Sequence, residues 1–172
     1  MAEDKLPEPW LRGTLTDISA VPRAVLHALQ LARLDVEHWC GNLNDEQLNE
    51  RPAGIPSIAF HIRHIARSID RLLTYAEGHQ LNAGQVAAMK TELDAGAKRD
   101  ELFAEFSSAL AQSDARIRKF AADRMSEPRK VGKKELPTTV GGLLVHVADH
   151  TQRHVGQAVT TSKFVRAQID SK

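Results

Sequence analysis

The sequence predicts an all-α protein, a four-helix bundle with short extra helical segments, and three observations support this prediction. Apolar residues recur at the three- and four-residue spacing of helices in four long segments. No segment shows a convincing alternation of period two, and the chain has no internal repeat. Polar and turn-forming residues separate the four segments, so their apolar faces are buried most simply against one another.

The first long helix is expected from about Asp17 to Cys40, where a broad apolar stripe follows helical spacing. Gly41 and Asn42 then supply a stop. A short helical turn over Asp45–Asn49 leads into Arg51–Pro56, a segment whose prolines and glycine break regular structure.

The second long helix should begin after Ser57, a good N-cap residue, and run to about Gly78. A shorter amphipathic helix is expected over Ala83–Leu93. The third long helix spans Arg99 to about Ala122, with three phenylalanines, two leucines and one isoleucine on one side.

The connection Pro128–Pro137 contains a basic cluster between breaking residues and is interpreted as a solvated loop. The fourth long helix begins near Thr138 or Thr139 and runs to about Val165.

At 172 residues the chain is long enough for one domain with a core of ordinary size. We therefore expect a single domain over residues 1–172, with an N-terminal arm over 1–15 and a C-terminal tail over 166–172.

The charge balance and the cysteine content restrict the class of protein. The chain has 23 Lys and Arg against 22 Asp and Glu, a net charge of +1 that does not favour a nucleic acid or a membrane as partner. The single cysteine, Cys40, excludes an intramolecular disulfide and fits a reducing compartment. The sequence shows neither a signal peptide nor a stretch long enough to span a membrane, so we expect a cytoplasmic protein.

Five of the eight histidines fall in two clusters, and these are the most informative residues of the chain. His146, His150 and His154 follow one another at four-residue steps, which places them on one helical face. His61 and His64 form a second pair upstream. Two imidazoles one turn apart can bind one metal ion, as in the H-E-x-x-H motif, but no Glu follows His150, which excludes a zinc protease of that type.

A third ligand would have to come from His61 or His64, and their i, i+3 spacing leaves both open. Neutral imidazole binds Zn, Ni, Fe or Cu at about 2.0–2.2 Å. From the spacing alone, a hydrogen-bonded histidine cluster without metal is an equal alternative.

Two segments resemble the signature helices of the DinB/YfiT-like family, bacterial four-helix bundles with a three-histidine metal site. One runs from Ser57 to Ala66, with Phe60 and His64-Ile-Ala as its characteristic residues, and the other is His150-Thr-Gln-Arg-His-Val-Gly-Gln157. The resemblance extends from about Thr16 to Lys163.

The resemblance implies that His64, His150 and His154 are the metal ligands. His61 and His146 are then additional or alternative ligands, and Gln157 is a candidate partner of a ligand. Two positions depart from the family pattern: Arg153 replaces a histidine, and Val155 replaces an arginine.

The resemblance also implies a function. Members of the superfamily include metal-dependent transferases that use bacillithiol, mycothiol or glutathione, and thiol-dependent isomerases. We therefore expect a divalent ion (Zn or Ni first, Fe or Mn next), a low-molecular-weight thiol as a second cofactor, a small-molecule substrate and a homodimer. The reaction would be thiol transfer to a small electrophile or metal-assisted hydrolysis. A non-catalytic metal-binding or stress-response protein and a dimeric helical scaffold remain the alternatives.

Overall fold

The computed structural model describes residues 6–170. Its main elements are four long helices, as the apolar periodicity predicts, and the all-α fold class is confirmed. The helix α3 begins where Ser57 was expected to cap it: the Ser57 hydroxyl accepts a hydrogen bond from the Phe60 backbone N–H at 3.2 Å. The four long helices are α1 (Ala20–Cys40), α3 (Ile58–Ala76), α5 (Arg99–Ile117) and α6 (Val140–Asp170).

Short elements connect the long ones. Two of them begin with the same device, a capping box in which an Asn side chain and a Gln side chain three residues later satisfy each other's backbone N–H groups. The short elements are η1 (Pro9–Leu11), α2 (Asp45–Asn49), η2 (Pro52–Gly54), α4 (Ala83–Lys90), η3 (Ala122–Arg124), β1 (Pro128–Val131) and β2 (Leu136–Thr139).

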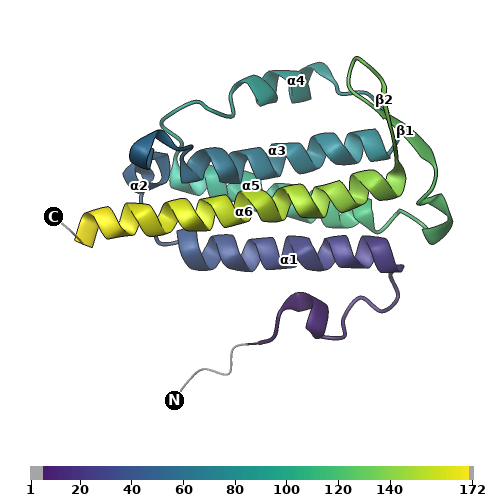
Figure 1. The fold of residues 1–172 in the computed structure, drawn as a ribbon, viewed down its shortest axis with the longest axis horizontal. Helices are drawn as coiled ribbons and strands as arrows, with labels where there is room; N and C mark the ends of the chain where they lie inside the picture. The colour runs from purple at the N-terminus through teal and green to yellow at the C-terminus, as the bar shows by residue number, and fades with distance from the viewer. Residues whose placement is uncertain (1–5, 171–172) are drawn as a thin grey trace.

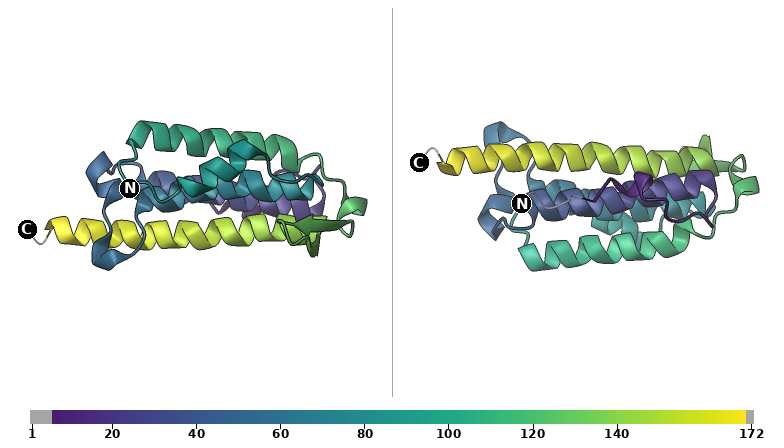
Figure 2. Two further views of the ribbon diagram at one scale, coloured as in Figure 1. Left: turned by 90° about the horizontal axis from the view of Figure 1, so that it is seen from above. Right: turned by 90° about the horizontal axis from the view of Figure 1, so that it is seen from below.

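The four long helices pack side by side, and α3 and α6 form the most extensive pair (Figures 1 and 2). The helix α6 also packs against α1, while α5 packs mainly on the other side of α3. The helix α4 lies outside the bundle beside α3 and has no buried residue of its own. Aliphatic side chains from all four long helices fill the core, among them Leu26, Ile65, Ile69, Ile117 and Leu144.

The connection before α6 is not the loop that the sequence indicates. Residues 128–131 and 136–139 form a two-stranded antiparallel hairpin, with Pro128 opposite Thr139 and Val131 opposite Leu136. Each strand has only four residues, too few for alternation to be recognised in the sequence. Tertiary contacts fix the hairpin instead, because the Arg129 guanidinium donates to the Ala76 carbonyl at the end of α3.

The ends of the chain add two details. The helix α6 continues to Asp170, five residues beyond the expected end at Val165, so most of the predicted tail is helical. Of the predicted N-terminal arm, residues 1–5 lie outside the described part, and η1 lies within the rest. None of the helices in residues 6–170 is both long and apolar enough to cross a membrane.

Candidate metal centre

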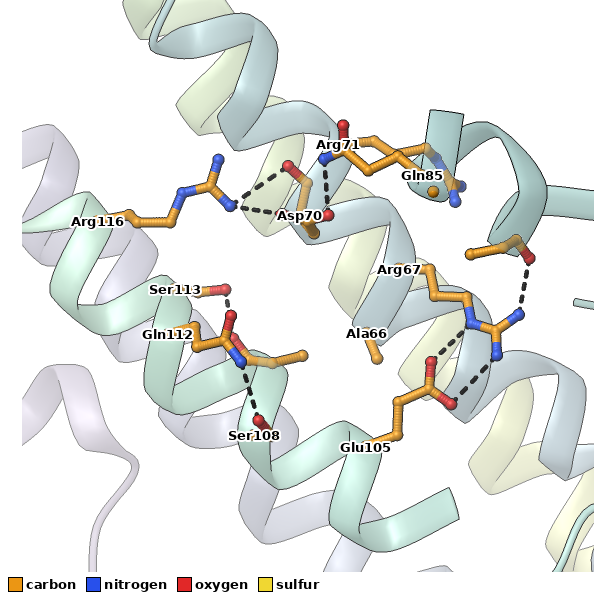
Figure 3. A pocket seen from close by; sticks show the side chains of 13 residues that line it. Ala66, Arg67, Asp70, Arg71, Gln85, Glu105, Ser108, Gln112, Ser113 and Arg116 are labelled. Carbon is orange, nitrogen blue, oxygen red and sulfur yellow. Dashed lines mark hydrogen bonds and ion pairs between the residues drawn. The ribbon is translucent and has the colours of Figure 1, made fainter. Parts of the chain in front are cut away.

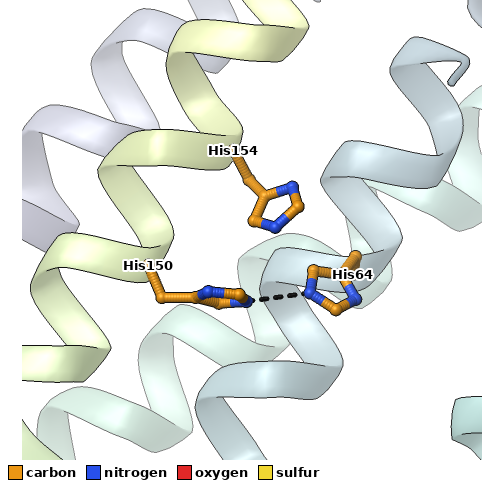
Figure 4. A group of neighbouring side chains, drawn as sticks. All are labelled: His64, His150 and His154. Carbon is orange, nitrogen blue, oxygen red and sulfur yellow. Dashed lines mark hydrogen bonds between the residues drawn. The ribbon is translucent and has the colours of Figure 1, made fainter. Parts of the chain in front are cut away.

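The structure brings three of the predicted histidines together between two helices. His64 on α3 faces His150 and His154 on α6, and one nitrogen from each ring lies within 4.8 Å of the other two (Figure 4). The closest approach is 2.8 Å, between Nε2 of His64 and Nε2 of His150. All three side chains are half-buried.

Helix geometry explains the convergence. His150 and His154 are one turn apart, so both rings project from the same face of α6. That face packs against α3, where His64 lies opposite. The Phe60 ring, one turn before His64, stacks on the His64 ring with centroids 5.4 Å apart. An aromatic face therefore restricts how the His64 ring turns.

The donor set fits a divalent ion. Two nitrogens bound to one zinc ion at about 2.0–2.1 Å in tetrahedral geometry lie about 3.3 Å apart. The spacing of the three rings, 2.8 Å for the closest pair and at most 4.8 Å, is of this size. The residues present could hold an ion with small adjustments of the rings.

Burial keeps the rings in the neutral form that metals bind. Burial, and then the adjacent His64, lower the pKa of His150 to about 4. Burial and the neighbouring imidazoles of His64 and His150 lower the pKa of His154 to about 3. At neutral pH these two rings therefore present lone pairs.

A carboxylate that the sequence analysis missed completes the surroundings of His64. The side chain of Glu92 is 7% exposed, and its Oε2 accepts a hydrogen bond from His64 Nδ1 at 2.7 Å. Its Oε1 accepts from Arg71 Nη1 at 2.5 Å. Burial raises the pKa of the Glu92 carboxyl group. The hydrogen bonds from His64 and Arg71 together lower this pKa by more than burial raises it, so the net shift is downward.

His61 lies beside the three-histidine group. It is buried, and its Nδ1 is 3.0 Å from Nδ1 of His154. Burial, together with the charge of His64, lowers the pKa of His61 to about 4. His61 thus contacts one nitrogen of a single candidate ligand, His154, whereas His64 faces both candidate ligands on α6.

The other two predicted site residues lie further out. His146 is exposed, with its Nδ1 3.9 Å from an Asp149 carboxylate oxygen. Gln157 is exposed on α6 and lines a cavity of about 510 Å³. Asp149 pairs with Arg153 at 2.6 Å, the i, i+4 contact that their spacing predicts. The cavity is bounded by Ile55, Pro56, His61, Arg153, Gly156, Gln157, Thr160 and Thr161.

A second cavity, of about 350 Å³, lies on the other side of α3, between α3, α4 and α5 (Figure 3). Its walls are rich in charge, but the charges are paired. Arg67 binds the Glu105 carboxylate at 2.6 Å, and Arg116 binds that of Asp70 at 2.7 Å. The charges in the wall of this cavity are therefore paired with one another, whereas the histidine group consists of imidazoles that approach one another and could bind a cation.

Comparison with known proteins identifies the family of the chain. The family model of the DinB superfamily matches residues 28–158, most of the chain. The chain belongs to the DinB superfamily. The resemblance seen in the two histidine-bearing segments is confirmed, and all three clustered histidines lie within the matched DinB region.

The DinB-type fold is also seen in the crystal structure of a conserved protein from Enterococcus faecalis. The two chains superimpose with a TM-score of 0.70 at 19% sequence identity, and the match covers 87% of this chain and 99% of that chain. At this identity the likeness concerns the fold. No curated protein matches the chain. As a DinB protein with three convergent histidines, the chain could bind a divalent metal.

Proposed function

We propose that this DinB protein is a metal-dependent enzyme that joins a low-molecular-weight thiol to a small electrophile. The single observation that carries the proposal is the convergence of His64, His150 and His154 between α3 and α6. Three protein ligands are typical of catalytic zinc sites, whereas structural sites use four. Zn or Ni is the expected ion, with Fe or Mn as further candidates, since imidazole suits several divalent metals.

The nucleophile has to come from outside the chain. The only cysteine, Cys40, is fully buried, and burial raises its thiol pKa to about 12 although Arg166 opposes this. Cys40 therefore stays protonated at neutral pH. A bound divalent ion lowers the pKa of a coordinated thiol or water and so supplies a nucleophile. In thiol transfer the sulfur–carbon bond forms as the leaving group departs with its electron pair, and the thiol proton is released.

The cavity beside the histidines supports a small-molecule substrate. His61 lines this cavity and also contacts His154, so the cavity adjoins the three-histidine group. Its wall combines the Arg153 guanidinium, the Gln157 amide and two threonines with the apolar Ile55. A small polar molecule fits this lining.

Metal content and thiol consumption test the proposal together. The protein should be purified without an affinity tag, loaded with zinc or nickel, and analysed for metal. We expect about one ion per chain, and loss of the ion in His64→Ala and His150→Ala. Exposed His79→Ala is the matched control, because it removes an imidazole elsewhere in the chain.

Activity then distinguishes the reactions. The loaded protein is offered bacillithiol, mycothiol or glutathione with a panel of small electrophiles, and the same electrophiles without thiol. Thiol-dependent turnover supports transfer. Turnover without thiol would contradict thiol transfer and indicate metal-assisted hydrolysis. Metal binding without any turnover would indicate a non-catalytic metal-binding protein. A protein that binds no metal after loading would indicate a helical scaffold without a metal site.

We also propose that the protein is a homodimer, on the strength of the family resemblance. Apolar side chains on the η1 and α1 side are available for such contact, because Trp10, Leu11 and Leu34 are all exposed. Light scattering should give twice the chain mass of 19.0 kDa. A monomeric mass would contradict this proposal.

A further inference from the structure

The segment that carries Glu92 lies outside the bundle and yet reaches the histidine group. Residues 82–94, called the α4 strap below, comprise α4 and the turn that follows it. All of the strap's apolar side chains are half-buried or exposed, including Val86, Met89 and Leu93. Glu92 is the exception, since it is the strap's one buried residue. Hydrophobic burial alone therefore does not explain why the strap ends where it does.

Three arginines on α3 hold the end of the strap. Arg63, Arg67 and Arg71 follow one another at four-residue steps and so form a ladder along one helical face. Each arginine donates hydrogen bonds to a different part of residues 88–94. The contacts are Arg63 Nη1 to the carbonyls of Thr91, Glu92 and Asp94 (3.3, 3.3 and 2.9 Å), Arg67 Nη1 to the Ala88 carbonyl and the Thr91 hydroxyl (2.7 and 2.9 Å), and Arg71 Nη1 to Glu92 Oε1 (2.5 Å).

His64 lies immediately after the first rung of this ladder. The arginines hold the Glu92 backbone and one of its carboxylate oxygens, and the second oxygen accepts from His64 Nδ1 at 2.7 Å. An ionised carboxylate has no proton to donate, so Nδ1 of His64 must carry the hydrogen of this bond. In the neutral ring the lone pair is then on Nε2, the nitrogen that lies 2.8 Å from Nε2 of His150.

We propose that Glu92 is a positioning residue that fixes the tautomer of His64, with the arginine ladder presenting its carboxylate. The inference rests on the proposed metal site, because it assigns a task to Glu92 within that site. Carboxylates that accept from the second nitrogen of a ligating histidine orient the ring and raise its basicity. Removing such a partner typically reduces metal affinity by about 10- to 100-fold.

The ladder makes one substitution particularly informative. In Glu92→Gln the side chain keeps its size but has only one oxygen. Arg71 is an obligate donor and takes that oxygen, which leaves the amide NH₂ facing His64. Nδ1 must then accept a hydrogen bond, and the proton moves to Nε2, where it blocks the lone pair. We expect the tautomer of His64 to reverse and the affinity for zinc to fall about 10- to 100-fold.

A second substitution should undo the first. In Glu92→Gln/Arg71→Met the arginine no longer claims the amide oxygen, so the amide is free to turn its oxygen toward His64. The Nδ1–H tautomer and a large part of the zinc affinity should return. Glu105→Gln is the matched control. Glu105 lies on α5 and pairs with Arg67 of α3, and its carboxylate does not contact His64.

The experiment is done on the full chain with two readouts. Long-range ¹H–¹⁵N NMR of the metal-free protein reports which nitrogen of His64 is protonated, and a competition titration with zinc reports affinity. Thermal unfolding checks that each variant is folded. We expect Nδ1–H in the wild type and in Glu105→Gln, and Nε2–H with weakened zinc binding in Glu92→Gln.

The outcomes separate the two proposals. A wild type that binds no zinc contradicts the proposed metal site, whatever the tautomer. A wild type that binds zinc, with an unchanged His64 tautomer and unchanged affinity in Glu92→Gln, would show that Glu92 is only the partner of Arg71 in an ion pair. Weakened affinity without a tautomer change would equally overturn the assigned role.

Discussion

The two faces of α3 carry polar clusters of opposite character. Toward α5, under α4, Arg67 and Arg116 bind the carboxylates of Glu105 and Asp70, so each charge meets an opposite one (Figure 3). Toward α6, three imidazoles approach one another (Figure 4), and of these His64 has a carboxylate partner, Glu92. One helix therefore supports a closed set of ion pairs on one face and an open set of nitrogen donors on the other.

We expect the charged face of α3 to contribute to stability and the histidine face to contribute to metal binding. Ion pairs that satisfy each other fasten helices together and leave no capacity for a ligand. Neutral imidazoles that converge on one point can instead bind a divalent cation. Substitutions on the charged face should therefore change the free energy of unfolding, and substitutions on the histidine face should change the affinity for zinc. Both expectations can be tested.

The largest effect is expected at the histidine face. Replacing His154 by Ala removes one of three donors, and we expect zinc affinity to fall at least about 100-fold, because zinc binding energy is shared among few ligands. Competition titration measures the loss, and exposed His146→Ala is the control. Equal losses in the two variants would show that the cluster extends one turn further along α6 than proposed.

The charged face should respond in stability instead. Arg116 donates to both Asp70 and Glu77 at 2.7 Å, and its side chain is 20% exposed. In Arg116→Met these carboxylates lose their charged partner, so we expect the free energy of unfolding to fall by about 1–3 kcal/mol with zinc affinity unchanged. Arg118→Met, which breaks an exposed pair with Asp114, should change the free energy of unfolding much less, because solvent screens that pair. A loss of zinc binding in Arg116→Met would mean that the two faces are coupled through α3.

A pH titration distinguishes the faces in another way. Burial lowers the pKa of His61 and His150 to about 4 and that of His154 to about 3. Between about pH 6.5 and pH 4 the unfolded chain therefore binds more protons than the folded one. The stability of the metal-free protein should decrease as the pH falls through this window, and the contribution of His154 should continue to about pH 3.

Removing one buried ring tests the cause of that slope. In His61→Gln the slope should decrease by up to about 1.4 kcal/mol per pH unit, the value for one proton. Exposed His79→Gln is the matched control, and chemical denaturation at several pH values is the measurement. A slope that His61→Gln leaves unchanged would assign the acid sensitivity to other groups.

Much of this arrangement follows from local sequence. The helical periodicity and the Ser57 cap predict the four long helices because both signals depend on neighbours within one turn. The four-residue step from His150 to His154 predicts their common face for the same reason. That His64 lies opposite them came from the resemblance, since spacing alone left His61 open.

The rest depends on contacts between distant segments. Glu92 is one acidic residue among 22 Asp and Glu, and it follows a short helix with no buried side chain. The four-residue steps of Arg63, Arg67 and Arg71 predict a shared face of α3, but nothing near Glu92 in the sequence indicates that they hold it. The hairpin over residues 128–139 was missed similarly, because packing against the end of α3 stabilises it.

The smallest prediction compares two threonines. Among the side chains of residues 6–168, Thr151 Oγ1 is the one fully buried oxygen or nitrogen without a hydrogen-bond partner. Thr74 Oγ1, on the charged face, donates to the Asp70 carbonyl at 2.9 Å and receives a hydrogen bond from Arg116. Thr151→Val should therefore raise the free energy of unfolding by about 1 kcal/mol, whereas Thr74→Val should lower it by about 1–3 kcal/mol.

Denaturant unfolding of the two metal-free variants measures both changes. The substitution is the same, so opposite signs would agree with the different hydrogen bonding of the two hydroxyls. If both variants lost stability, the Thr151 hydroxyl would have a partner after all, and the polar groups next to His150 would be satisfied as completely as those on the charged face.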